Sequence, residues 1–140
     1  MKKFLICTLT IIILVVVLKV ANVKRIILRK MYVKDYSEYV YEYATEYNVD
    51  PLLVFAVIKA ESNFKKDATS TSNAIGLMQL MENTAIETGE KVNEKINSKE
   101  ELYNPKINVK IGIKYLSELL ERYDGNLEIA LAAYLSLIHI

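Results

Sequence analysis

Cysteine and histidine are nearly absent from this chain of 140 residues. Cys7 is the only cysteine and lies inside an apolar stretch, so one chain can form neither a disulfide nor a cysteine-rich metal site. His139 is the only histidine and belongs to an apolar tail, where we expect neither catalysis nor metal binding. Function must therefore be sought in other side chains.

Basic residues are scarce in the larger part of the chain. Residues 35–140 carry ten Lys and Arg against seventeen Asp and Glu, a net charge of −7, whereas residues 1–34 carry eight Lys and Arg and no acid. An acidic domain lacks the basic face that nucleic-acid binding requires, so we expect no nucleic-acid partner. The basic residues between Lys24 and Lys34 suit anionic lipid headgroups instead.

A long apolar run occurs once, at residues 4–18, after Lys2 and Lys3. Such a segment is a secretory signal peptide or a membrane helix. A spanning helix needs roughly 20 residues, which the run reaches if Lys19 snorkels and residues 20–23 are added. Lys19-Val20-Ala21 places a charge where a cleavage site requires a small residue. We therefore favour an uncleaved anchor over residues 1–34 with a basic linker; if the segment is cleaved, the protein is secreted.

The charges around this segment predict its orientation. Six Lys and Arg follow the apolar run and two precede it, so the positive-inside rule would place the C-terminal side in the cytoplasm. The function inferred below requires that side to face the cell wall. We give the chemistry of the site precedence and expect a single-pass anchor with residues 35–140 outside.

Alternating β-strand patterns and internal repeats are also absent, and the remaining pattern predicts an all-α domain. Tyrosines recur at positions 36, 39, 43 and 47, the spacing of one helix face, and we interpret them as core residues. Asp50 and Pro51 are typical of a helix start. The expected helices are 35–48, 51–62, 74–89 as two short pieces, 107–123 and 127–134. We expect Asn126 to cap the last of these helices, and Ser98 and Glu101 to form a capping box.

Glu61 ends the most apolar of these helices. The preceding residues 51–60 contain one charge, Lys59, so we expect this helix to be the buried central one. A carboxyl group at the border of a protein interior has a raised pKa and becomes available as a general acid. Glycosidic cleavage needs such a donor to protonate the leaving oxygen. By itself the observation is weak, because most glutamates at helix ends are surface residues.

The residues after Glu61 make this interpretation specific. They are Glu61-Ser62-Asn63-Phe64, Ala68-Thr69-Ser70, the run from Ala74 to Met81, and Thr84-Ala85. This series resembles the signature of the lytic transglycosylase SLT domain, of the soluble-lytic-transglycosylase and goose-type lysozyme-like class, at all but two fixed positions. Later matches are Asn104-Pro105, Asn108, Gly112, Tyr115-Leu116, Gly125-Asn126 and Ala132-Ala133-Tyr134. Many matched positions at fixed spacing are a far stronger signal than one short motif.

The resemblance implies a lysozyme-like fold and a role for five residues. Glu61 corresponds to the sole catalytic acid/base, and Ser70 to the serine near the substrate's N-acetyl group. Gln79 and Met81 correspond to positions lining the sugar subsites, and Tyr134 to the tyrosine facing the catalytic glutamate. The implied reaction cleaves the bond between N-acetylmuramic acid and N-acetylglucosamine and forms a 1,6-anhydromuramoyl product. The implied partner is peptidoglycan, with no cofactor and no metal, and we expect a monomer.

The sequence departs from the family pattern at three places. Asn73 replaces a glycine, and asparagine tolerates left-handed backbone better than most residues. Glu82 replaces a proline. After Tyr134 the family continues with asparagine and a glycine-rich loop, whereas this chain has an apolar tail, so we expect the catalytic domain 35–140 to be incomplete at its C-terminus. Two alternatives stay open: a goose-type lysozyme-like hydrolase of the same bond, and an inactive wall-binding or truncated module.

Overall fold

The structure is a computed structural model that describes Lys19 and residues 35–139. The chain separates into two units, residues 1–34 and residues 35–140, and the description below concerns the second. The apolar run 4–18, expected to be a membrane anchor, lies outside the described residues. Within the described part of the chain, no helix has the length and apolar character needed to cross a bilayer.

Residues 35–139 form an all-α unit, as the sequence predicts. Their only β-type pairings are two isolated antiparallel bridges, Thr69 with Ile75 and Ile75 with Leu80. The elements in chain order are α2 (Ser37–Glu46), α3 (Pro51–Ser62), α4 (Glu82–Lys91), the 3-10 helix η1 (Lys99–Tyr103), α5 (Pro105–Arg122) and α6 (Leu127–His139).

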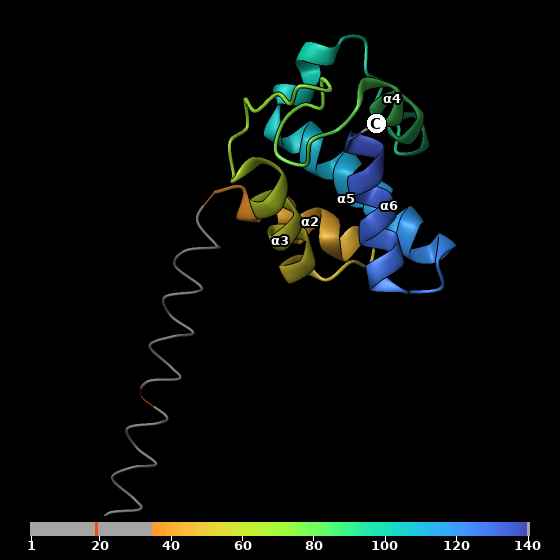
Figure 1. The fold of residues 1–140 in the computed structure, drawn as a ribbon. Helices are drawn as coiled ribbons and strands as arrows, with labels where there is room; N and C mark the ends of the chain where they lie inside the picture. Colours follow the sequence, from red (N-terminus) through yellow and green to blue (C-terminus); the bar gives the residue numbers. More distant parts are fainter. Residues whose placement is uncertain (1–18, 20–34, 140) are drawn as a thin grey trace, which may run out of the picture. The chain divides into compact units, whose positions relative to one another are not determined.

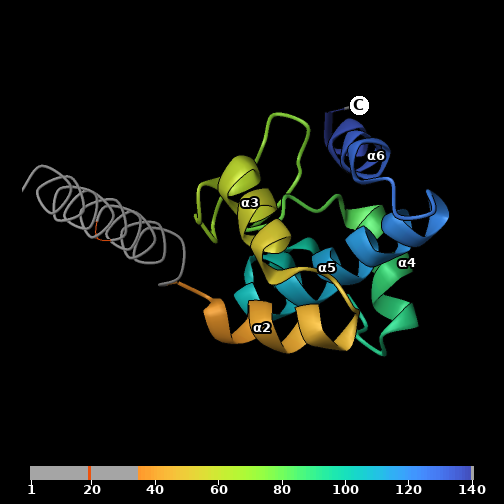
Figure 2. The same ribbon diagram turned by 90° about the horizontal axis from the view of Figure 1, so that it is seen from below.

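The central helix is α5, not α3 as the sequence led us to expect. Helix α5 packs against α2, α4, α6 and η1, and in both ribbon views it runs through the middle of this unit (Figures 1 and 2). Helix α3 packs mainly on α2, and Leu52 in its first turn is 69% exposed. The difference is physical: α5 buries residues on several sides, including Val109, Ile111 and Ile113, whereas α3 buries a narrower face.

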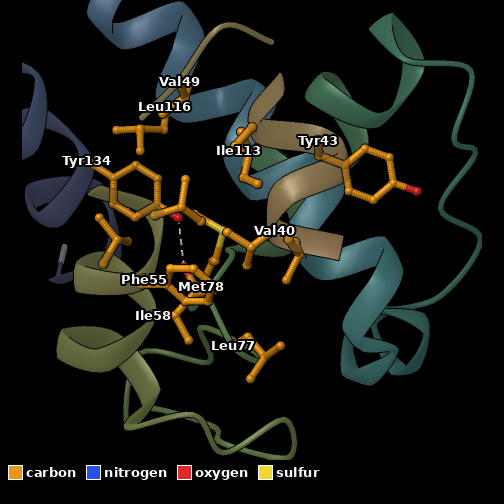
Figure 3. Packing of buried hydrophobic residues seen from close by; sticks show 14 of the residues in the cluster. Val40, Tyr43, Val49, Phe55, Ile58, Leu77, Met78, Ile113, Leu116 and Tyr134 are labelled. Carbon is orange, nitrogen blue, oxygen red and sulfur yellow. Dashed lines mark hydrogen bonds between the residues drawn. The ribbon is translucent and has the colours of Figure 1, made fainter. Parts of the chain in front are cut away.

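Two apolar clusters hold the unit together. The larger joins α2, α3, α5 and α6 and includes Tyr43 from the predicted tyrosine face, with the other tyrosines of that face packed at its edge. Figure 3 shows Phe55, Met78, Leu116 and Tyr134 meeting in this cluster. The smaller cluster lies where α4 and η1 meet α5, and consists of Ile75, Leu80, Ala85, Ile96, Leu102 and Ile111. The segment 74–80 contributes to both, so it is fixed from two sides.

Local signals in the sequence define most helix starts. The Asp50 carboxylate accepts a hydrogen bond from the Leu52 N–H at 2.8 Å, and Pro51 is the first helical residue, as predicted. The Asn104 side chain caps α5 through the Lys106 N–H, so this helix begins two residues before the predicted start. Asn126 caps α6 through the Ile129 N–H, as predicted, although α6 continues past Tyr134 to His139.

Two local predictions were wrong. Residues 74–81 do not form a helical piece, because Gly76 and Gln79 both have positive φ and turn the backbone instead. The helix of this region is α4, which begins at Glu82. Ser98 precedes η1 but makes no side-chain cap hydrogen bond, and the Glu101 carboxylate instead accepts from the Asn97 backbone and side chain. A capping box therefore does not form there.

Candidate active site

Glu61 lies in the last turn of α3 and is half-buried. The helix ends directly after it because Asn63 adopts a left-handed conformation with φ 51°, and its N–H donates to the Lys59 carbonyl at 3.2 Å. Phe64 also has positive φ, so the chain turns sharply away from the helix axis. This abrupt end leaves the Glu61 carboxyl at the border between the apolar core and the following loop.

The loop facing α3 is a compact hydrogen-bonded unit over residues 68–80. The Gly76 N–H donates to the Ala68 carbonyl at 2.8 Å, which closes residues 68–76 into a ring. Ile75 and Leu80 exchange two backbone hydrogen bonds of 2.9 Å each across a tight turn. The rigidity of this segment therefore comes from backbone pairing although it contains no named helix or strand.

This loop brings together two of the predicted site residues, Ser70 and Gln79. The Ser70 hydroxyl is half-buried and accepts hydrogen bonds from the Ser72 and Ala74 N–H groups at 3.2 and 3.0 Å. The buried Gln79 side chain donates through Nε2 to the carbonyls of Ala68 and Gly76. Both side chains are thereby held in fixed orientations by the loop backbone itself.

Two positions in the loop need unusual backbone geometry. Gly76 has φ +80°, and a Cβ atom there would lie 2.3 Å from the Asn108 amide nitrogen, so only glycine fits. Asn73, which replaces the family glycine, has φ 65°. The expectation that asparagine tolerates a left-handed backbone at this position is thus confirmed.

Asn108 holds the loop from the side of α5, and sequence reasoning gave it no role. Its Oδ1 accepts from the Met78 N–H at 2.8 Å, and its Nδ2 donates to the carbonyls of Ile75 and Leu102 at 2.9 Å each. The side chain is fully buried. The available signal was a lone amide on the apolar face of a predicted helix, because a buried amide must find partners.

Tyr134 connects α6 to the same loop and to Glu61. Its ring is fully buried, and its hydroxyl donates to the Met78 carbonyl at 2.8 Å (Figure 3). Burial raises the pKa of Tyr134 well above its ordinary value, and the nearby Glu61 carboxylate and then Tyr115 raise it further. The effect of Glu61 means that its carboxylate lies within electrostatic range of this hydroxyl. The tyrosine therefore stays neutral and acts as a donor.

Met81, the fifth predicted site residue, lies at a pocket. It occupies the N-cap position of α4 and is half-buried. A pocket of about 300 Å³ opens next to it, lined by Ser72, Asn73, Ile75, Met81, Glu82, Asn83 and Lys99. The Tyr134–Met78 hydrogen bond thus joins α6 to the loop that carries Ser70 and Gln79, and Met81 follows two residues after Gln79 at the pocket.

Residues 35–139 contain no group of three or more His, Cys, Asp or Glu side chains arranged to hold a metal ion. The expectation that the reaction uses no cofactor and no metal stays a prediction.

Comparison with known proteins identifies the family. The sequence matches the transglycosylase SLT domain over residues 38–136, which include all five predicted site residues. This chain belongs to that family. It is 33% identical over 92 residues to the membrane-bound lytic murein transglycosylase E of Buchnera aphidicola, which covers 64% of this chain and 42% of that protein.

Solved structures share the fold. An inactive mutant of the lytic transglycosylase Slt from Pseudomonas aeruginosa matches with a TM-score of 0.71 and 33% identity, over 76% of this chain and 17% of that chain. The 70-kDa soluble lytic transglycosylase from Escherichia coli matches with a TM-score of 0.72 and 25% identity, over 80% of this chain and 18% of that one. The all-α, lysozyme-like SLT fold is therefore established. The chain spans 17–42% of the length of the first curated relatives that it matches.

Proposed function

We propose that this protein is a peptidoglycan lytic transglycosylase with Glu61 as its only catalytic acid/base. The observation that carries the proposal is the half-buried Glu61 at the abrupt end of α3, in a domain that matches the SLT family over residues 38–136. Relatives from several bacteria bear the name lytic murein transglycosylase, which supports the same reaction here.

In the proposed reaction, Glu61 first acts as an acid. Its proton passes to the oxygen that links N-acetylmuramic acid to N-acetylglucosamine as that bond breaks, and the substrate's acetamide group supports the developing positive charge. The resulting Glu61 carboxylate then takes the proton of the muramoyl C6 hydroxyl. The C6 oxygen bonds to the anomeric carbon and closes a 1,6-anhydro ring, so water is not consumed.

Ser70, Gln79 and Met81 would bind the glycan strand. The Ser70 hydroxyl accepts two backbone hydrogen bonds and retains its own proton, which can be donated to the acetamide oxygen of the substrate. Gln79 and Met81, in the segment that leads into α4, would line the sugar subsites. Tyr134 is fully buried and would not touch the substrate. It would act indirectly, because its hydroxyl holds the carbonyl of Met78, the residue before Gln79.

The N-terminal sequence bears on where this reaction would take place. We propose that residues 1–34 anchor the protein in the membrane and that residues 35–140 are the catalytic domain facing the cell wall. The apolar run 4–18 and the basic residues after it support an anchor. Two of the similar relatives carry the description membrane-bound in their names.

The proposed role of Glu61 is tested by the Glu61→Gln substitution in the full chain. We expect release of soluble anhydromuropeptides from purified peptidoglycan to fall by at least about 10²-fold, because loss of a general acid/base costs roughly 10²–10⁴ in rate. Glu87→Gln, at an exposed position on α4, is the matched control and should retain wild-type release. Equal release by wild type and Glu61→Gln would overturn the assignment.

A further inference from the structure

Asn108 is a buried polar side chain for which the proposed mechanism has no use. It lies in the first half of α5, where its neighbours Val109, Ile111 and Ile113 are fully buried apolar residues. Its three hydrogen bonds all reach outside its own helix, to the loop 68–80 and to η1. A buried amide without partners is costly, so an amide with all these bonds satisfied specifies one arrangement of the groups around it.

The bonds of Asn108 hold the turn that carries Gln79 at two points. At the start of the turn, Nδ2 donates to the carbonyl of Ile75, the residue that pairs with Leu80. Within the turn, directly before Gln79, Oδ1 accepts from the Met78 N–H. The same Nδ2 also donates to the Leu102 carbonyl, so the turn is fixed relative to η1 as well as α5.

Met78 connects Asn108 to the candidate catalytic centre. Its N–H is bound by Asn108, and its carbonyl accepts from the Tyr134 hydroxyl, which lies within electrostatic range of Glu61. Close packing leaves this segment little freedom, because a Cβ atom on Gly112 would lie 2.5 Å from the Met78 sulfur. A displacement at Asn108 would therefore be passed to Gln79 on one side and to Tyr134 on the other.

We propose that Asn108 is a positioning residue for the active site: its amide sets the turn 75–80 and thereby the placement of Gln79 and Tyr134 relative to Glu61. The proposal rests on the lytic transglycosylase function proposed above. Asn108 itself does not touch substrate. Its contribution is larger for rate than for binding, because misplacement by about 1 Å costs up to roughly 10²-fold when reacting groups must be aligned.

The test compares two conservative changes on α5 in the full chain. Asn108→Asp keeps the shape and the acceptor for the Met78 N–H, but places an oxygen against the carbonyls of Ile75 and Leu102. The matched control is Ser117→Ala, which removes another buried hydrogen bond of α5, from the Ser117 hydroxyl to the Tyr47 carbonyl at 3.0 Å. Both variants are assayed well below their melting temperatures, with soluble glycan strands as substrate.

We expect Asn108→Asp to lower kcat by roughly 10- to 100-fold and to raise KM by a smaller factor, because Gln79 lines a sugar subsite in the proposed function. Ser117→Ala should keep the wild-type kcat even if its melting temperature falls as much as that of Asn108→Asp. A wild-type kcat for Asn108→Asp, or a loss confined to KM, would overturn the proposal. If Asn108→Asp does not fold, Asn108→Ser replaces it with the same expectation, and failure of both to fold would assign Asn108 to folding alone.

Hydrogen exchange provides a readout that does not need enzymatic activity. In Asn108→Asp the amides of Ile75, Met78 and Leu80 should exchange faster, while those of α2 and α3 keep wild-type protection. Ser117→Ala should leave the turn amides unchanged. Unchanged exchange at the turn in Asn108→Asp would overturn the positioning role. If the wild-type chain releases no anhydro product while Asn108→Asp still shows these exchange changes, the proposed function alone is contradicted.

Discussion

Tyr134 joins the core and the candidate site through a single hydroxyl. Its ring fills the larger apolar cluster beside Tyr115, with 5.5 Å between ring centroids, and its hydroxyl satisfies the buried Met78 carbonyl. Stability and site geometry therefore depend on the same atom. The sequence motif indicated a tyrosine near Glu61, but the pairing with Met78 depends on the loop conformation and could not be predicted from it.

Replacing this hydroxyl should destabilise the fold measurably. Tyr134→Phe leaves the Met78 carbonyl buried without its donor, and an unsatisfied buried group costs about 1–3 kcal/mol. Urea denaturation should show the free energy of unfolding reduced by that amount. Tyr123→Phe, at the half-buried C-cap of α5, should change it by less than about 0.5 kcal/mol. Equal stability of wild type and Tyr134→Phe would contradict the assigned hydrogen bond.

At the scale of elements, the helix starts were predictable and the loop was not. Capping is a local effect, so Asp50-Pro51 and Asn126 predicted two helix starts directly, whereas the start of α5 after Asn104 was predicted two residues late. The turn 75–80 instead depends on contacts distant in sequence, above all on Asn108, 30 residues after Met78. Glu61 was visible as an acid after an apolar helix, whereas Asn108 matched a position of the family signature but its hydrogen-bond partners could not be predicted from the sequence.

The presence or absence of a cap hydrogen bond predicts which N-cap side chains stabilise the fold. Asp50→Ala and Asn104→Ala each remove a side-chain acceptor from a helix N-terminus and should lower the free energy of unfolding by about 1 kcal/mol. Ser98→Ala should have an effect below about 0.5 kcal/mol, because Ser98 makes no cap hydrogen bond. Thermal or urea unfolding of the three variants checks this. A loss for Ser98→Ala as large as for Asn104→Ala would show that the assigned caps are wrong.

At the scale of the whole molecule, buried tyrosines should make the fold sensitive to alkali. Burial is the largest cause that raises the pKa of Tyr43, Tyr47, Tyr115 and Tyr134. An unfolded tyrosine ionises near pH ~10, while the fold keeps these side chains neutral, so above that pH the unfolded state binds fewer protons than the folded state. The stabilising contribution is complete below pH ~10 and is lost as the pH rises through the raised values.

We therefore expect the melting temperature to fall steadily above pH ~10. Absorbance of ionised tyrosine from the buried side chains should appear together with loss of the helical circular dichroism signal. Tyr134→Phe should show a shallower fall per pH unit than wild type, because it lacks one of the groups that ionise on unfolding. Complete tyrosine ionisation while the helical signal persists would contradict the burial of these rings.

The proposed reaction as a whole is tested most directly by whether oxygen from water enters the product. The full chain is incubated with purified peptidoglycan in water enriched in oxygen-18, and the soluble fragments are weighed by mass spectrometry. The account predicts muramoyl ends that are one water lighter than reducing ends and that contain no oxygen-18, because the C6 hydroxyl closes the ring. Reducing muramoyl ends that carry oxygen-18 would contradict it and identify a hydrolase.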